Sequence, residues 1–408
     1  MDEKKNGGKF LKGFLAGIAG TLVVCIVAVS VLSFNGYSLT QQTVTGDRNN
    51  TNGTLKTGLT ADMLKKMTYI NSIVDKYYLF DKSEEDVANG IYAGMMAGLG
   101  DPYSVYYTED EYNSLMESSS GVFCGIGVVV QANVTTGIIS VVRAMPGTPG
   151  EEAGFISGDI IYAVDGTEVT GMDLSNVVAL IKGEEGTEVT VTIYRDNEKM
   201  DFTLKRAKIE VPTVEYKMMD NNIGYIQVTE FDDITVEQYK TAHEDLTNQG
   251  MEGLIVDLRD NPGGLLSSVC SMLDEMLPEG LIVYTEDKDG NREEEKSDAE
   301  HQFTKPLAVL INGNSASASE IYAGAIKDYG TGTLIGTQSF GKGIVQRIIE
   351  LGDGSAIKLT ISNYFTPKGN NIHKIGITPD IVVEANADTP EDEQLDKAVE
   401  VITEKLGK

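Results

Sequence analysis

The chain has 408 residues, of which 41% are hydrophobic, 23% charged and 7% aromatic, and this composition excludes collagen-like, mucin-like and low-complexity proteins. At about 150 residues per domain, the length predicts two to three domains. The 62 acidic residues outnumber the 33 basic ones and give a formal net charge of −29, so nucleic acid is not an expected partner. The three cysteines and three histidines are widely spaced, so we expect neither a disulfide framework nor a metal site.

The first 35 residues predict a membrane anchor. Residues 13–34 carry no charge, and about 20 apolar residues suffice to span a bilayer. The positive residues ahead of this segment, which predict a cytoplasmic N-terminus and an extracytoplasmic body, are Lys4, Lys5, Lys9 and Lys12. We therefore predict a single-pass protein of the cell membrane, with residues 1–35 as its cytoplasmic tip and anchor. The alternative is a signal peptide cleaved near residues 28–30, which would yield a secreted protein.

A linker and a small helical module are predicted next. Residues 36–60 are rich in Gly, Thr and Asn and lack apolar periodicity, which is typical of a linker. Within residues 61–119, apolar side chains recur at helical spacing in two segments, and the second ends near residues 98–100. These apolar positions are Met67, Ile70, Val74 and Tyr77 in the first segment and Val87, Ile91 and Met95 in the second.

Residues 120–408 predict two larger units and a final helix. Together with the preceding segments, they indicate a multidomain α+β protein. Residues 120–207 form short β-rich runs separated by turns, which indicates a compact β domain. Residues 208–385 alternate strands with helices near 235–249, 265–277 and 319–329, which predicts a largely parallel sheet. In residues 386–408, Thr389-Pro390 is a typical helix start. The apolar face of that C-terminal helix is predicted to comprise Leu395, Val399, Ile402 and Leu406.

Three serines, Ser315, Ser317 and Ser319, lie where a buried strand turns into an amphipathic helix. A serine presented on such a turn resembles the nucleophile turns of hydrolases, and the amides of a helix N-terminus favour developing negative charge. The alternative is purely structural, because Ser317 and Glu320 have the spacing of a capping box.

Lys342 and Gln346 follow in a second segment of interest. Residues 336–343 approach the nucleotide-binding pattern G-x-x-x-x-G-K-[ST], but position 343 is glycine, so the hydroxyl ligand for magnesium is missing. A lysine can instead act as the general base for a serine if a dry site lowers its pKa from about 10.4. If this segment is a strand, Lys342 and Gln346 share one face, and the glutamine carbonyl can hold the amine.

An oxyanion site is the third requirement. Residues 254–258 read as a strand that leads into Asn261-Pro262-Gly263-Gly264 and a helix. Glycine amides can approach a substrate carbonyl closely and stabilise its negative charge. The alternative is an ordinary turn between a strand and a helix.

Taken together, these segments resemble the C-terminal processing peptidases, the tail-specific serine endopeptidases of family S41 that carry a PDZ domain. The resemblance covers residues 61–385. It depends on the motifs GLGDPYS (98–104), GIGV (125–128), LRDNPGG (258–264), SASASE (315–320), FGKG (340–343) and IHKIGITPDI (372–381).

The resemblance implies a role for each candidate residue. Ser317 would be the nucleophile, Lys342 the base and Gln346 the residue that orients it. The oxyanion donors would be the amides of Gly263 and Ala318, with Gly264 left open as the alternative to Gly263. Residues 208–385 would form a protease core similar to the crotonase and Clp peptidase fold. No metal or organic cofactor is implied.

Residues 120–207 resemble the PDZ domain of this family, which would bind a free polypeptide C-terminus by adding it as a strand, with loop amides receiving the carboxylate. The alternative is a simple tight turn at this loop. The loop that would receive the carboxylate comprises Phe123, Cys124, Gly125, Ile126, Gly127 and Val128.

We therefore predict a membrane-anchored, exported serine endopeptidase that cleaves polypeptides selected by their C-terminal tails. One alternative is a catalytically silent PDZ adaptor that binds exported C-termini. A trypsin-like PDZ protease is a second alternative, but none of His243, His301 and His373 lies in a recognisable triad motif. By analogy with the family that the chain resembles, the terminal helical segments would pair two protomers into a homodimer.

Overall fold

The computed structural model describes residues 60–386 and 391–408. The predicted anchor (1–35), almost all of the predicted linker and Thr389-Pro390 therefore lie outside the described residues. Within the described ranges, no helix combines the length and the apolar character needed to cross a bilayer.

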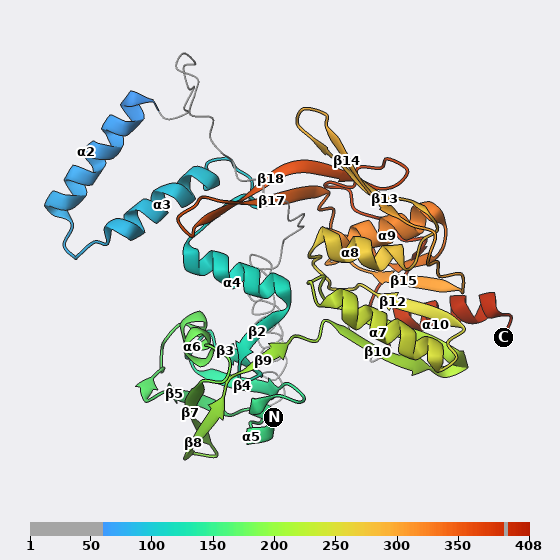
Figure 1. Ribbon diagram of the computed structural model, residues 1–408, viewed down its shortest axis with the longest axis horizontal. Coiled ribbons are helices and arrows are strands. Elements are labelled where there is room, and N and C mark those ends of the chain that lie inside the picture. The colour runs from blue at the N-terminus through green and yellow to red at the C-terminus, as the bar shows by residue number, and fades with distance from the viewer. Residues whose placement is uncertain (1–59, 387–390) are drawn as a thin grey trace, which may run out of the picture.

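The N-terminal module contains α2 (Ala61–Tyr77), α3 (Glu84–Ala97), β1 (Val105–Tyr107) and α4 (Glu109–Ser120). The Thr60 hydroxyl caps α2 by accepting the Met63 amide, and the Ser83 hydroxyl caps α3 by accepting the Asp86 amide. Both helices form where apolar periodicity predicts them. They project away from the rest of the chain (Figure 1), and neither contains a buried residue. Among residues 60–386 and 391–408, nothing buries their apolar faces.

The PDZ unit is an antiparallel sheet with two short helices. Its sheet order is β3-β4-β5-β7-β8, so β3 is an edge strand, and β6 pairs with β5. Its core includes Ile126, Phe155 and Val177, and the last of these comes from α6. The elements are β2 (Val122–Gly125), β3 (Val128–Ala132), β4 (Ile139–Ala144), α5 (Pro149–Ala153), β5 (Ile160–Val164), β6 (Thr167–Glu168), α6 (Leu174–Ile181), β7 (Glu188–Arg195), β8 (Glu198–Lys205) and β9 (Ala207–Glu210).

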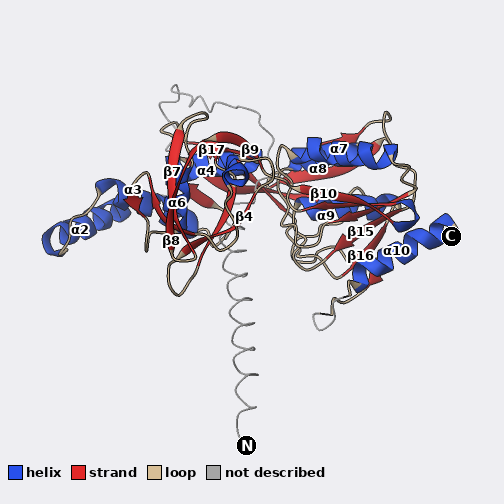
Figure 2. Ribbon diagram, turned by 90° about the horizontal axis from the view of Figure 1, so that it is seen from below, coloured by secondary structure: helices blue, strands red, loops and turns tan. Residues whose placement is uncertain are grey.

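The unit predicted over residues 208–385 is built on a six-stranded sheet of order β10-β11-β12-β15-β16-β19. From β11 to β19 all neighbours are parallel, as the alternation of strands and helices predicts, and β10 joins the edge antiparallel. Helices α7, α8 and α9 lie on one face and α10 on the other (Figure 2). Successive side chains of β12 alternate accordingly, because Leu254 and Val256 pack toward α7–α9 while Ile255 packs toward α10.

The elements of this core follow in chain order. They are β10 (Val214–Met219), the 3-10 helix η1 (Asp220–Asn222), β11 (Ile223–Val228), α7 (Thr235–Asn248), β12 (Gly253–Asp257), α8 (Leu266–Asp274), β13 (Gly280–Asp287), β14 (Arg292–Ser297), β15 (Leu307–Ile311), α9 (Ala318–Tyr329), β16 (Thr333–Gly336), β17 (Ile344–Glu350), β18 (Ala356–Phe365), β19 (Ile381–Val382) and α10 (Glu393–Leu406).

A second, antiparallel sheet joins the N-terminal module to the core. Its order is β1-β18-β13-β14, and β17 also pairs with β18 to form a long hairpin. Strand β1 pairs with β18 through Val105 opposite Lys358 and Tyr107 opposite Ala356. The strands β17 and β18 have no intervening helix, so the sequence pattern of a parallel sheet does not extend to them.

The C-terminal helix α10 begins at Glu393. The side chain of Asp392 accepts the amide of Leu395 and caps the helix. Asp392 also pairs with Arg259, at 2.7 Å between Oδ1 and Nη1, and Arg259 binds the buried carboxylate of Asp257 at the end of β12. These contacts fix the start of α10 beside the central sheet.

Candidate active site

Ser317 precedes α9 directly, in the turn that follows β15. Its backbone has φ 55° and ψ −113°, a conformation that residues other than glycine rarely adopt. Its carbonyl oxygen accepts the amides of Glu320 (2.9 Å) and Ile321 (3.0 Å), so the helix begins at once. Such strain, of order 1–3 kcal/mol, persists only where surrounding contacts impose it, and it is common at functional sites. The turn therefore holds the half-buried Ser317 side chain in one fixed position.

The neighbouring serines have structural contacts. The Ser315 hydroxyl donates to the carbonyl oxygen of Leu258 at 2.8 Å, and the Ser319 hydroxyl donates to that of Asn261 at 2.9 Å. Both side chains are buried. They fasten the Ser317 turn to Leu258 and to Asn261, the residue that begins the glycine-containing loop 261–264. The hydroxyls of Ser315 and Ser319 thus hold the turn, which distinguishes them from Ser317.

Lys342 is almost completely buried, with 1% of its surface exposed. It precedes β17 instead of lying within it, and the pairing of β17 with β18 is irregular between Val345 and Gln346. The expectation that Lys342 and Gln346 share a face of one strand is therefore wrong. Lys342 is placed by its backbone, because its amide donates to Oε2 of Glu320 at 2.8 Å.

Glu320 connects the two segments that carry Ser317 and Lys342. Its carboxylate accepts the amide of Ser317 (2.9 Å), the amide of Gly341 (2.7 Å) and the hydroxyl of Ser339 (2.6 Å), in addition to the Lys342 amide. The buried hydroxyl of Tyr364 adds a second link, since it lies 3.0 Å from the Ser317 carbonyl oxygen and 2.5 Å from that of Lys342. The backbone of the two candidate residues is thus held together at two points.

The environment of Lys342 disfavours its charged form. Burial lowers its pKa well below the ordinary lysine value, and the positive charge of Lys358 lowers the pKa further. The negative charges of Glu320 and Asp101 oppose this shift without cancelling it. The ring of Tyr103 also covers the amine, with 4.9 Å from the ring centre to Nζ. A neutral lysine amine is what a general base requires.

Gln346 is buried, with 4% of its surface exposed. Its Nε2 donates to Oγ1 of Thr360 at 3.3 Å. It shares with Ser317 a small cavity of about 20 Å³. The cavity is lined by Gly264, Leu266, Ser317, Ala318, Ile321, Ile344, Val345, Gln346 and Tyr364. Ser317 and Gln346, which are 29 positions apart in the sequence (346 minus 317), therefore face one space.

Both glycines of the 261–264 loop are required for steric reasons. A Cβ atom at Gly263 would lie 2.8 Å from Cβ of Ser317, and one at Gly264 would collide with the backbone of Phe231. The Gly263 amide donates to Oδ1 of Asn261 at 2.8 Å. Gly264, together with Ala318, lines the cavity beside Ser317.

The PDZ loop runs from β2 through Ile126 and Gly127 into β3. Gly127 has φ 72°, and its carbonyl oxygen accepts the Met145 amide (2.8 Å) and the Thr148 hydroxyl (3.1 Å), so the loop is held against α5. The ammonium group of Lys182, at the end of α6, lies 4.9 Å from the ring centre of Phe123 and pairs with Glu117 of α4. The loop thus adjoins the edge strand β3 and one positive charge.

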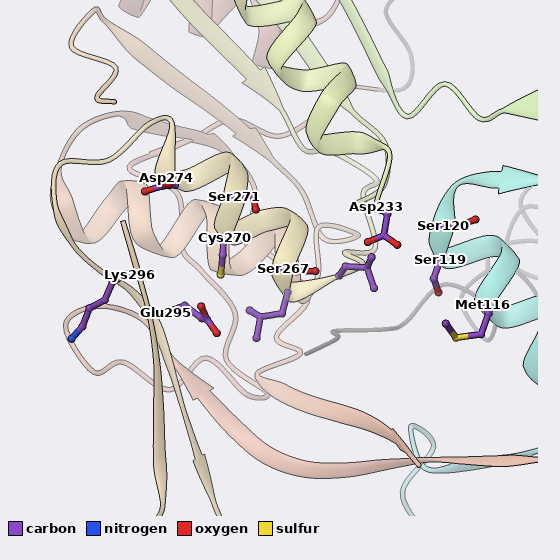
Figure 3. A pocket seen from close by; sticks show the side chains of 12 residues that line it. Met116, Ser119, Ser120, Asp233, Ser267, Cys270, Ser271, Asp274, Glu295 and Lys296 are labelled. Carbon is purple, nitrogen blue, oxygen red and sulfur yellow. The ribbon is translucent and has the colours of Figure 1, made fainter. Parts of the chain in front are cut away.

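A larger cavity of about 540 Å³ lies between α4, α8 and β14. Figure 3 shows Ser267 and Cys270 of α8 between Met116 and Ser119 of α4 on one side and Glu295 of β14 on the other. It contains none of the candidate catalytic side chains. Leu266 lines both this cavity and the small one beside Ser317, so the two are adjacent.

Sequence reasoning missed several residues of the site. Glu320 was read only as a helix cap, although the same carboxylate organises the Lys342 loop. Asp101 and Tyr103 lie in the motif GLGDPYS, which was recognised but given no role. No sequence pattern around Lys358 indicates a role at the site, because Lys358 is placed by the pairing of β18 with the distant strand β1.

Comparison with known proteins agrees with this architecture. The profile of peptidase family S41 matches residues 222–383, a PDZ domain profile matches residues 140–195, and the profile "Activating protease CtpB N-terminal domain" matches residues 25–111. The carboxy-terminal processing protease CtpA of Bacillus subtilis (strain 168) is 37% identical over 365 residues, which is 89% of this chain and 76% of that protein.

Two further similarities concern one more relative and one solved structure. The carboxyl-terminal-processing protease of Synechocystis sp. (strain ATCC 27184 / PCC 6803 / Kazusa) is 35% identical over 321 residues, 76% of this chain and 75% of that protein. The solved photosystem II D1 C-terminal processing protease is 28% identical with a TM-score of 0.48, covering 83% of this chain and 90% of its own.

The α/β core and the attached PDZ unit define a serine peptidase with a PDZ domain. The chain belongs to peptidase family S41. Within that family it is a C-terminal processing protease.

A substitution of Lys358 tests what sets the pKa of Lys342. Lys358 is buried, and burial lowers its own pKa to about 8, so near neutrality it is largely charged and repels a proton from Lys342. Lys358→Met should therefore raise the pKa of Lys342 and move the pH midpoint of kcat upward by about one unit. The measurement is a pH profile of kcat between pH 5 and 10. Lys358→Arg, which keeps the charge, is the control, and an unchanged midpoint in Lys358→Met would contradict the assignment.

Proposed function

We propose that Ser317, Lys342 and Gln346 form the catalytic site of this protease. The observation that carries the proposal is the buried Lys342, which has a strongly lowered pKa and is tied through Glu320 to the backbone of the half-buried Ser317. A buried lysine whose backbone is tied through Glu320 to a strained serine has no evident structural benefit, since its desolvation costs stability. The silent PDZ adaptor has no use for such an arrangement. Hydrolysis of an unstructured polypeptide by the wild type and by Ser317→Ala tests the proposal directly.

The chemistry follows from these groups. Oγ of Ser317 attacks the scissile carbonyl carbon while Nζ of Lys342 takes the serine proton, and the resulting ammonium group gives a proton to the leaving amine. Water then hydrolyses the acyl-enzyme by the same route in reverse. Gln346 accepts a hydrogen bond from Nζ and keeps the lone pair of the amine directed at Ser317.

The oxyanion of the tetrahedral intermediate needs two backbone donors. Ala318 is the first, as the sequence resemblance implied. For the second, the sequence favoured Gly263 and left Gly264 open. The lining of the cavity supports Gly264, because the Gly263 amide already donates to Asn261.

The substrates are polypeptides that enter by their C-terminal tails. A tail would add to the free edge of β3, and the loop of residues 123–128 would receive its carboxylate. The cavity between α4 and α8 lies between this PDZ unit and Ser317, and it offers a path for the chain. The apolar lining of the small cavity, with Leu266, Ile321 and Ile344, suits a small apolar side chain before the scissile bond.

Amidation of the substrate C-terminus tests the role of the PDZ domain. An amide lacks the negative charge that the loop amides and Lys182 would bind, so it should bind more weakly and be cleaved more slowly. Coupling energies of this kind are typically 1–3 kcal/mol, about 5- to 150-fold in kcat/KM. The measurement compares the acid and amide forms of one peptide with an identical scissile bond.

The control for this comparison is a peptide whose tail is too short to reach the PDZ loop from Ser317, for which the two forms should be cleaved equally. Equal rates for the long acid and amide peptides would reduce the PDZ domain to a spacer and remove tail selection from the proposed function.

We also propose the predicted cellular setting, a body held outside the cytoplasm by residues 1–35. The uncharged segment 13–34 and the lysines ahead of it support this proposal. The test adds protease to intact cells, to cells without their outer barrier and to lysed cells, and follows a C-terminal epitope. Loss of the epitope once the outer barrier is removed, before lysis, would support an extracytoplasmic location. An epitope found in the cytosolic fraction would contradict the proposal.

A homodimer through the terminal helices is the last part of the proposal. The exposed apolar side chains of α2 and α3 support it, and a second copy of the same two helices is the occupant we propose. Ile70→Glu combined with Ile91→Glu should then convert a dimer of residues 60–408 to a monomer in sedimentation. A monomeric wild type would contradict it. The exposed side chains of α2, of α3 and of the segment between them include Leu64, Tyr69, Ile70, Ile73, Tyr77, Leu79, Phe80, Ile91, Tyr92 and Met95.

A further inference from the structure

The N-terminal module reaches the active site through the loop before β1. Strand β1 pairs with β18 from Val105 opposite Lys358 onward, and Ser104, just before β1, contacts Thr360 of β18. The Ser104 hydroxyl accepts the amide of Thr360 at 3.1 Å and donates to Oδ2 of Asp101 at 2.6 Å. Residues more than 250 positions apart in the sequence therefore form one polar cluster (360 minus 104 is 256).

Asp101 is ionised in this cluster. Burial favours the neutral acid, but hydrogen bonds from the side chains of Ser104 and Thr360 and from the amide of Tyr103 outweigh burial and lower the pKa of Asp101 below its ordinary value. A carboxylate has no proton to donate. Thr360 is one of the groups that lower the pKa of Asp101, and toward a carboxylate its hydroxyl can act only as the donor.

This direction fixes the role of Thr360 toward Gln346. The Thr360 hydroxyl has one proton, and it donates this proton to Asp101. Toward Gln346 the Thr360 oxygen can therefore only accept a hydrogen bond, and it accepts one from Nε2 at 3.3 Å. The carbonyl oxygen of Ile344 lies 3.5 Å from the same Nε2. The amide nitrogen of Gln346 is thereby directed toward β17 and β18, and its carbonyl oxygen toward the opposite side.

We propose that Asp101 is a positioning residue for the catalytic site, which acts through Thr360 to set the amide orientation of Gln346. This inference depends on the proposed function, in which the Gln346 carbonyl accepts a hydrogen bond from Nζ of Lys342. A reversed amide would present NH₂ to the neutral amine, and the carbonyl of Gln346 would then no longer direct that amine toward Ser317. The N-terminal module is thus part of the catalytic apparatus and more than a spacer.

The test removes the hydroxyl of Thr360 without changing the shape of the side chain. Thr360→Val should lower kcat at least about 10-fold with KM nearly unchanged, since the change affects orientation of the base and not substrate binding. It should slow the labelling of Ser317 by a fluorophosphonate to the same extent. Thr360→Ser restores the hydroxyl and should recover activity to within about 3-fold of the wild type.

A matched control removes a similar bond far from the site. Thr192 in β7 donates to Oδ1 of Asp201 in β8 at 2.7 Å, within the PDZ sheet. Thr192→Val should leave the labelling rate of Ser317 within about 2-fold of the wild type.

Asp101→Asn is a second test of the inference, because an amide can donate to Thr360 and the Thr360 hydroxyl is then no longer restricted to donating toward residue 101. Because the charge of Asp101 also raises the pKa of Lys342, the comparison is made at a pH above the midpoint of the kcat profile, where Lys342 is neutral in all variants. There, Asp101→Asn should lose as much activity as Thr360→Val, and the two losses should not add.

The decisive comparison places Thr360→Val in a Gln346→Ala background. If Thr360 acts through Gln346, the second substitution should change the labelling rate less than about 2-fold. A full 10-fold loss in that background, or full labelling of Thr360→Val alone, would overturn the inference while leaving the Ser317 chemistry intact. Absence of labelling at Ser317 in the wild type would overturn the proposed function and this inference together.

Discussion

Ser317→Ala should lower kcat for peptide hydrolysis by about 10,000-fold or more, because it removes the atom that forms the acyl-enzyme. The free energy of unfolding should change by less than about 1 kcal/mol. The Ser317 amide and carbonyl make the contacts that hold the turn, and both remain in alanine. The measurements are steady-state kinetics and thermal unfolding of the same preparation.

Ser315→Ala and Ser319→Ala are the matched controls, and they should show the reverse pattern. Each removes a buried hydroxyl that binds a backbone carbonyl, so each should lower the free energy of unfolding by about 1–3 kcal/mol. Both should retain far more activity than Ser317→Ala. Equal losses of activity in all three variants would mean that Ser317 is not the nucleophile.

Lys342→Arg should be inactive, although it keeps a positive charge and a long side chain. The guanidinium group stays protonated at all accessible pH values and cannot accept the serine proton. In the wild type, activity should rise with pH, since the working form of Lys342 is neutral and its fraction grows as pH passes the lowered pKa. A pH–rate profile of kcat measures this midpoint.

Lys342→Met separates the catalytic role from the structural one. Between its lowered pKa in the folded state and about 10.4 in the unfolded chain, Lys342 is neutral when folded and protonated when unfolded, so it lowers stability most at low pH. The methionine variant should therefore be inactive and yet unfold at a higher temperature than the wild type at neutral pH. The difference should shrink as pH rises. An active Lys342→Arg, or a Lys342→Met that unfolds earlier than the wild type, would refute the assignment of Lys342 as a buried neutral base.

Local patterns predicted the elements well where a helix or strand is decided by its own residues. The predicted helix 319–329 is α9, which begins one residue earlier, at Ala318. The predicted helix 235–249 is α7, which ends one residue earlier, at Asn248. Apolar periodicity also predicted α2 and α3, but a pattern of apolar residues cannot say what covers them. In one chain nothing described buries that face.

The sequence alone determined the chemical groups of this protein: three serines on a turn before a helix, one lysine and one glutamine in a second segment, and glycines after a buried strand. The motifs also placed it in its family. The tertiary structure decided what those groups can do. Burial of Lys342 beside Lys358, the four hydrogen bonds to Glu320, and the link from Asp101 through Thr360 to Gln346 join segments far apart in the chain. The pKa of Lys342 and the amide orientation of Gln346 depend on which residues surround them in space. Those neighbours come from distant parts of the chain, so local sequence patterns do not reveal them.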